Sequence, residues 1–138
     1  MINCPDEQRS GSPIVTISKI PRTVAWTAVV AWAGVIFWFS SLPGSQVPGR
    51  FGPLGHFGEY AIFGALILIA LDAPGRLLGA VALASAYGVT DELHQLFVVG
   101  RHADPIDWIV DTTGALVGVA VTAWVWRRII ARYANGRP

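Results

Sequence analysis

The residues best suited to chemistry are concentrated between residues 87 and 111 of the chain. This stretch, YGVTDELHQLFVVGRHADPIDWIVD, holds five carboxylates, two histidines, one glutamine and one arginine. A second polar group, HFGEY at residues 56–60, has the same character. Both groups lie in apolar sequence long enough to cross a bilayer, where charged side chains are costly and usually mark function. We therefore expect the two groups to meet in one working site.

Helical spacing predicts which of these side chains face the same way, because residues three and four positions apart share a helix face. Asp91, His94 and Gln95 have this spacing, while Glu92 is offset and is expected to face a neighbouring helix. In a catalytic site, Asp91 or Glu92 would be the general base and His94 the proton shuttle.

The residues of the second group share a face in the same way. His56, Glu59 and Tyr60 are spaced at i, i+3 and i+4. Glu59 and Asp111 each lie six residues after a proline at a predicted helix start, so they should reach a similar depth. We expect a cluster with these members: Glu59, Glu92, Asp111, His56 and His94.

The residue types leave three kinds of site open. Carboxylates and histidines could act together as general acid and base. They could bind a divalent cation through oxygen and imidazole ligands. They could also bind a polar headgroup or a drug without chemistry. No serine or cysteine stands in an obvious nucleophile context.

Several of the polar residues also have a purely structural interpretation. Asp104 and Asp107 are well placed to cap the helix that starts at residue 105. Arg101 could bind a phosphate group of a ligand through its planar guanidinium, or it could simply pair with these exposed acids. Gly114 and Gly118 form a G-x-x-x-G pattern, which predicts close helix packing rather than chemistry.

The composition favours a membrane protein. Of the 138 residues, 53% are hydrophobic and only 14% are charged, against about 25% charged in soluble domains. The net charge of +1 does not indicate the strongly basic surface that is typical of nucleic-acid-binding proteins. Cys4 is the only cysteine, so no disulfide can form within the chain.

The hydrophobic pattern predicts an all-α, integral membrane four-helix bundle with short loops. The predicted helices are 24–42, 54–71, 77–99 and 104–126. Short loops make consecutive helices antiparallel. This topology brings the end of the third helix beside the starts of the second and fourth, which are the three places that carry the polar residues.

The predicted domains are a mobile cytoplasmic tail at 1–23, a membrane domain at 24–128 and a basic cytoplasmic tail at 129–138. A secretory signal peptide is the competing interpretation of the first apolar run. That run has 19 residues without a charge, whereas the apolar part of a signal peptide has about 7–15. Its length favours a retained span.

Lys and Arg predict the orientation, because they are enriched in cytoplasmic loops. Of the ten basic residues, eight fall on the side of the two termini. They are Arg9, Lys19, Arg22, Arg76, Arg127, Arg128, Arg132 and Arg137. Only Arg50 and Arg101 fall on the other side, so both termini should be cytoplasmic and the polar end should face outward.

Two stretches resemble the VanZ-like family: GHFGEYAIFG at 55–64 and YGVTDELHQLFVVGRHADPIDWIVDTTGALVG at 87–118. The resemblance covers about half of the chain. The matching positions are His56, Tyr60, Glu92, Gln95, Arg101, Asp107 and Gly114. Many members of the family carry an Asp-Lys pair where this chain has Gly52 and Pro53. Any family role that needs this lysine is therefore not expected here.

The resemblance implies a multi-pass protein of the bacterial inner membrane, linked through the family's namesake to low-level teicoplanin resistance. The implied function is to lower sensitivity to lipoglycopeptides by binding or modifying a lipid-linked envelope component. The implied partners are the lipid bilayer and a lipid-linked precursor or the lipoglycopeptide itself. The alternative is a non-catalytic binding or assembly module in which the same residues form a fixed polar network.

Overall fold

The computed structural model describes residues 20–46, 52–73, 75–134 and 136. These residues form four α-helices, a single-turn 3₁₀ helix and no strand. The elements are α1 (Arg22–Ser40), η1 (Gly44–Gln46), α2 (Gly52–Leu71), α3 (Leu77–Gln95) and α4 (Pro105–Ala134). The predicted all-α four-helix bundle is confirmed. Most of the predicted N-terminal tail lies outside the described residues.

Three of the helices are long and apolar enough to cross a membrane: α1, α2 and residues Pro105–Arg132 of α4. The fourth, α3, has a similar length of 19 residues. It is less apolar because its last turns carry Asp91, Glu92 and His94. By length and composition, α1, α2 and α4 are therefore the candidate spans, and α3 is the helix that carries Asp91 and Glu92.

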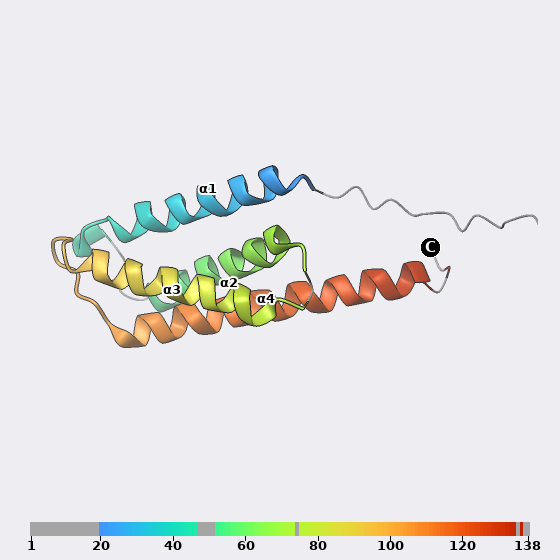
Figure 1. Cartoon of the computed structure of the whole chain (residues 1–138). Helices are drawn as coiled ribbons and strands as arrows, with labels where there is room; N and C mark the ends of the chain where they lie inside the picture. Colours follow the sequence, from blue (N-terminus) through green and yellow to red (C-terminus); the bar gives the residue numbers. More distant parts are fainter. Residues whose placement is uncertain (1–19, 47–51, 74, 135, 137–138) are drawn as a thin grey trace, which may run out of the picture.

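The helices alternate in direction, as the short loops predict (Figure 1). The α1–α2 and α3–α4 connections lie together at one end of the bundle, on the left of Figure 1. The α2–α3 turn lies toward the other end, as does the start of α1, and α4 continues beyond the other helices there. We call the end with the α1–α2 and α3–α4 connections the polar end, since the acids of α3 lie there.

Glycines on α4 lie in the most extensive helix contact of the bundle, which is between α2 and α4. A Cβ atom on Gly114 would collide with the backbone of Phe57, and one on Gly118 would collide with the backbone of Ala61. Only a glycine lets two helix backbones approach this closely. The interpretation of the G-x-x-x-G pattern as helix packing is confirmed.

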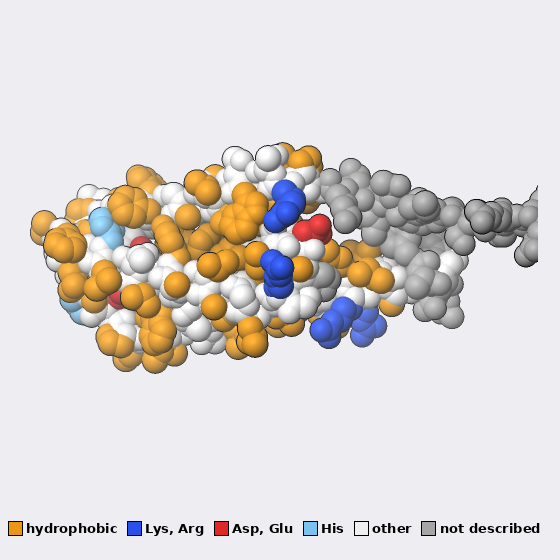
Figure 2. All heavy atoms as spheres, in the orientation of Figure 1, with side chains coloured by type: hydrophobic (Ala, Val, Ile, Leu, Met, Phe, Trp, Pro, Cys, Tyr) orange, Lys and Arg blue, Asp and Glu red, His pale blue; other side chains and the backbone are white. Residues whose placement is uncertain are grey.

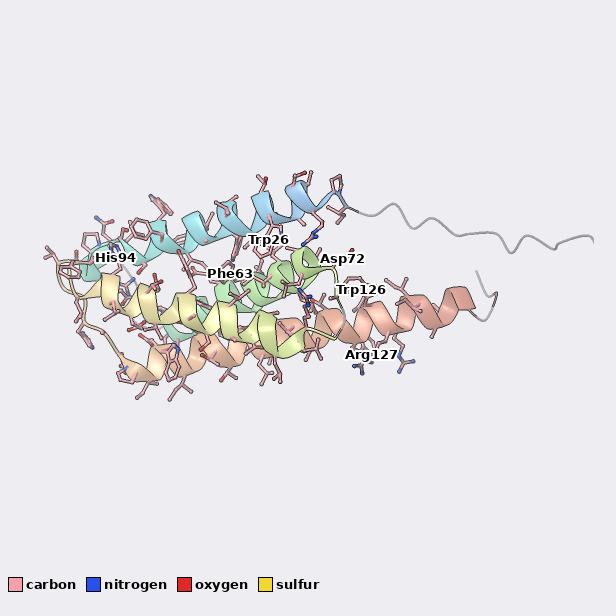
Figure 3. The ribbon with its side chains drawn as sticks, viewed as in Figure 1. Trp26, Phe63, Asp72, His94, Trp126 and Arg127 are labelled. Carbon is pink, nitrogen blue, oxygen red and sulfur yellow. The ribbon has the colours of Figure 1, made fainter. Side chains whose placement is uncertain are left out.

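The outer surface of the bundle is largely apolar. Figure 2 shows hydrophobic side chains along most of the visible face, with Lys and Arg gathered away from the polar end. Figure 3 shows His94 at the polar end and Asp72 and Arg127 toward the other. Among the described residues, Arg101 is the one Lys or Arg at the polar end, and Arg22, Arg76, Arg127, Arg128 and Arg132 lie away from it. This distribution follows the expected one, and the orientation relative to the membrane stays a prediction.

Two predicted helix ends differ from the structure. α3 ends at Gln95 rather than at residue 99, because its last turn tightens through bonds from Phe97 N–H to His94 O and from Val98 N–H to Gln95 O. Asp91 therefore lies about 6 Å from the helix end rather than about 12 Å, at 1.5 Å per residue. α4 continues eight residues past 126, to Ala134.

Candidate functional site

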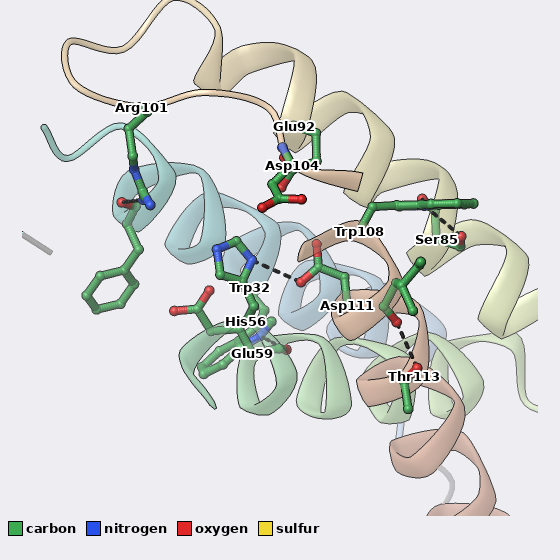
Figure 4. Close-up of polar contacts among 12 residues, drawn as sticks. Trp32, His56, Glu59, Ser85, Glu92, Arg101, Asp104, Trp108, Asp111 and Thr113 are labelled. Atoms are coloured by element: carbon green, nitrogen blue, oxygen red, sulfur yellow. Dashed lines mark hydrogen bonds and ion pairs between the residues drawn. The ribbon is translucent and has the colours of Figure 1, made fainter. Parts of the chain in front are cut away.

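Four buried side chains from three helices converge at the polar end. They are His56 of α2, Asp91 and Glu92 of α3, and Asp111 of α4. One nitrogen or oxygen atom from each lies within 4.8 Å of those of the others. We call these four residues the acid–histidine cluster. Figure 4 shows His56, Glu92 and Asp111 pointing toward one another from their separate helices.

His56 and Asp111 form the best-defined pair of the cluster. Nδ1 of His56 donates to Oδ1 of Asp111 over 3.0 Å (Figure 4). Asp111 is fully buried, so this bond offsets part of the cost of removing its carboxylate from water. The second oxygen, Oδ2, has no hydrogen-bond partner among the described residues. The pair joins α2 to α4 and leaves one oxygen available.

Glu92 connects the end of α3 to the start of α4. Its Oε2 accepts the backbone N–H of Asp104 over 2.7 Å. Asp104 in turn accepts the N–H of Ile106 through Oδ1 over 2.8 Å, so it caps α4 as predicted. The other oxygen of Glu92, Oε1, is buried without a partner within the described part of the chain. Glu92 thus faces a neighbouring helix, as its offset indicates, and keeps one oxygen free.

Asp91 is the least satisfied member of the cluster. Its side chain is 3% exposed, and neither carboxylate oxygen has a hydrogen-bond partner among the residues described. Ser40 and Gln95 lie close to it, but Ser40 Oγ and Gln95 Nε2 are themselves buried without a hydrogen bond of normal geometry to any described residue. An unpaired buried carboxylate is costly, so Asp91 is the member of the cluster whose burial is least offset by the described residues.

A cavity of about 200 Å³ adjoins the cluster. His56 and Asp91 line it, together with Glu59 and Arg101. The rest of its wall comes from the end of α1 and the first turn of α2: Phe39, Ser40, Gly52 and Gly55. Backbone N–H groups in a first helix turn lack partners within the helix and attract anions. The lining of the cavity therefore combines acidic groups with groups that can bind an anion.

Arg101 supplies the positive charge of this cavity. Its Nε is buried without a partner among the described residues, and an Nη nitrogen makes only a long contact of 3.4 Å to Phe39 O. Most of the donor capacity of the guanidinium therefore remains unused. No bond from Arg101 to Asp104 or Asp107 appears within the described part of the chain.

Two glycines fix the loop that carries Arg101. Gly100 has φ 75°, a backbone conformation that side chains disfavour. Gly44 of the α1–α2 connection packs so closely that a Cβ atom there would collide with the Gly100 carbonyl. Its N–H also donates to Val99 O over 3.1 Å. The two connections at the polar end are therefore fixed to each other, and this contact positions Arg101.

His94 lies against α1 and is not among the four residues of the cluster. Its Nε2 is 3.0 Å from Ser41 Oγ, and its ring is 4.4 Å from that of Phe37. The Ser41 hydroxyl already donates to Phe37 O, so it accepts from His94. The predicted cluster thus contains His56, Glu92 and Asp111, with His94 held at its side.

The remaining predicted site residues have separate surroundings. Glu59 lines the cavity. Tyr60 is fully buried and packs on Phe63 and Tyr87. Gln95 is buried near Asp91. Asp107 is half-buried in the first turn of α4, where an acid stabilises the helix start.

Sequence reasoning missed two residues that shape the site. Ser40 is buried at the end of α1 and lines the cavity. The antiparallel topology could have placed it there, since α1 ends at the same end of the bundle as α3. A Cβ atom on Gly88 would lie 3.4 Å from Asp111 Oδ2 and 3.2 Å from Trp108 Cδ1. Gly88 therefore leaves room for the Asp111 carboxylate beside α3.

The fold and this site define a class: a small, all-helical, multi-pass membrane protein with a buried acid–histidine cluster at one end. Within that class the chain belongs to the VanZ/LLP1 family, whose family model matches residues 7–127. The family expected from the two motifs is therefore confirmed. Comparisons with curated proteins and with solved structures gave no match.

Proposed function

We propose that this protein lowers the sensitivity of a bacterium to lipoglycopeptides such as teicoplanin. It does so by binding or modifying a lipid-linked envelope component at an outward-facing polar end. The observation that carries the proposal is the cavity between Arg101 and the acid–histidine cluster. The protein sits in the inner membrane with both termini in the cytoplasm.

The cavity suits the phosphate of a lipid headgroup. Arg101 offers a planar fork of donors, and phosphate accepts such a fork through two oxygens. Gly52 and Gly55 of the first turn of α2 also line the cavity, and a helix N-terminus favours bound anions. Phe39 supports lipid as the source of the phosphate, because this apolar residue lines the cavity together with the polar groups.

If the bound component is modified, Asp91 is the base that the geometry favours. Asp91 lines the same cavity as Arg101, and its oxygens have no partner among the described residues. Glu92 is the second candidate, but one of its oxygens already holds the Asp104 N–H. A general base must come within hydrogen-bond reach of the proton that it removes, and a headgroup in the cavity would bring its hydroxyl groups to Asp91.

The alternative is a non-catalytic binding or assembly module. Two bonds favour it: the His56–Asp111 pair joins α2 to α4, and Glu92 holds the start of α4. An Asp91→Asn variant distinguishes the two forms, because it keeps the shape of the side chain and removes the base. Turnover of a purified lipid-linked substrate would disappear in this variant if the site is catalytic, while binding would persist in either form.

Arg101→Lys tests the proposal in cells. Lysine keeps the charge and loses the planar fork, so we expect normal membrane levels, an unchanged melting temperature and loss of protection against teicoplanin. Arg76→Lys, at the opposite end of the bundle, is the matched control and should protect fully. Full protection by a well-expressed Arg101→Lys protein would remove Arg101 from the site, and no protection by the unaltered chain would refute the resistance function.

A further inference from the structure

We propose that the acid–histidine cluster binds one divalent metal ion through His56, Asp91, Glu92 and Asp111. The proposal goes beyond the headgroup site, because a metal ion can bind in the absence of any phosphate-bearing lipid. It commits to a single ion held by ligands from α2, α3 and α4. The ion would also connect these three helices at the polar end.

The spacing of the four side chains suits one ion. One possible ligand atom from each residue lies within 4.8 Å of the others. Bonds from divalent metals to oxygen or imidazole nitrogen are about 2.0–2.6 Å long, so ligands on opposite sides of an ion are about 4–5 Å apart. All four residues can therefore reach a common ion without a change in the fold.

Unpartnered oxygens provide a second and independent reason. Asp91 is only 3% exposed, so it is 97% buried. Both of its carboxylate oxygens lack a hydrogen-bond partner among the described residues. The same holds for Oδ2 of Asp111 and Oε1 of Glu92. Three carboxylates in an apolar bundle repel one another and have lost their water. A divalent cation at their centre would satisfy all of these oxygens together.

The bonds already present would orient the ligands rather than compete with the ion. Asp111 uses Oδ1 to accept from His56, and Glu92 uses Oε2 to accept from Asp104 N–H. In each carboxylate, one oxygen holds the side chain in position and the other is left for the metal. Ligands of protein metal sites are commonly oriented by such hydrogen bonds.

The ligand set also limits the kind of ion. Three carboxylates favour Mg²⁺, Ca²⁺ and Mn²⁺, whereas an imidazole favours transition metals such as Zn²⁺ and Fe²⁺. Mn²⁺ accepts carboxylate ligands and is also a first-row transition metal that can bind imidazole. We therefore base the test on Mn²⁺. His56 and Asp91 also line the cavity, which provides a path for the ion from the polar end to the cluster.

The test is a Mn²⁺ titration of the purified full-length chain in detergent, followed by electron paramagnetic resonance. The chain is first stripped of metal and no phosphate-bearing lipid is added. Bound Mn²⁺ loses the sharp signal of the free ion, so the spectrum gives the stoichiometry and the affinity. We expect one ion per chain and, in the bound state, spin-echo modulation from the imidazole nitrogen of His56.

Asp91→Asn should weaken Mn²⁺ binding by about tenfold or more. Asp72→Asn is the matched control, because it makes the same acid-to-amide change at the opposite end of the bundle, away from the cluster. It should change the affinity by less than about twofold. If Asp91→Asn does not fold, Glu92→Gln replaces it, since the amide oxygen of Gln can still accept the Asp104 N–H.

Either of two results would overturn the proposal. The first is that the folded chain binds none of Mn²⁺, Zn²⁺, Ca²⁺ and Mg²⁺. The second is that Asp91→Asn and Glu92→Gln bind Mn²⁺ as tightly as the unaltered chain. Because lipid is absent from the titration, these results do not test the proposed headgroup site. Failure of the teicoplanin assay likewise does not test the proposed metal site.

Discussion

Asp91 and Asp111 are two buried aspartates of one cluster with opposite surroundings. Asp111 accepts a bond from His56, whereas Asp91 has no hydrogen-bond partner within the described part of the chain. The difference explains why we assign Asp111 to the scaffold as well as to the site. Asp91 has no such bond among the described residues, so we assign it to the proposed site alone.

Acid-to-amide substitutions at these two positions should therefore differ in their effect on stability. In metal-free protein, Asp111→Asn should lower the free energy of unfolding by about 1 kcal/mol, because a bond to a charged acceptor becomes a neutral one. Asp91→Asn should leave it unchanged or raise it, since a buried unpaired charge is removed. Melting curves of the two variants in the same detergent, followed by circular dichroism, measure the difference. Equal destabilisation by both would contradict the distinct roles.

At the scale of elements, the α2–α4 contact determines how the cluster is assembled. Gly118 packs against the backbone of Ala61, and the same pair of helices carries the His56–Asp111 bond. A helix contact of this closeness fixes the height of Asp111 relative to His56. The glycines of α4 therefore support the site although they take no part in its chemistry.

Gly118→Ala should disturb this contact. Its Cβ would collide with a backbone carbonyl, which cannot rotate away as a side chain can, so the free energy of unfolding should fall by about 1–3 kcal/mol. Gly34→Ala in α1 is the control, because a Cβ there meets nothing within 4 Å. It should be neutral or stabilise the protein by up to about 1 kcal/mol. If the Gly118→Ala and Gly34→Ala proteins had the same melting temperature, the contact would be looser than the structure indicates.

Elements also show how far sequence reasoning reaches. The antiparallel order placed His56, Glu92 and Asp111 together, because three helix ends with known directions have few ways to meet. It did not predict the side of α3 on which His94 lies, since i, i+3 spacing leaves the rotation toward α1 undetermined. It also extended α3 to residue 99, because LFVV is as apolar as a helix interior and the turn before Gly100 depends on tertiary contacts with Gly44.

At the scale of the whole molecule, the basic residues predict how the bundle sits in the membrane. A Cys4→Ser background provides a chain without other cysteines, into which Ser45→Cys and Gly75→Cys can be introduced one at a time. Both positions are exposed, at opposite ends of the bundle. A membrane-impermeant thiol reagent should label position 45 in intact spheroplasts and position 75 only after lysis. Labelling of position 75 from outside would reverse the orientation.

The central claim is that the polar end binds a phosphate-bearing lipid through Arg101. The most direct measurement is native mass spectrometry of the purified chain with an isoprenyl phosphate and with the matching isoprenyl alcohol. The account predicts that the unaltered chain and Arg76→Lys retain the phosphate in preference to the alcohol, and that Arg101→Lys loses this preference. Equal retention of phosphate and alcohol by the unaltered chain would contradict the claim, as would an undiminished preference in Arg101→Lys.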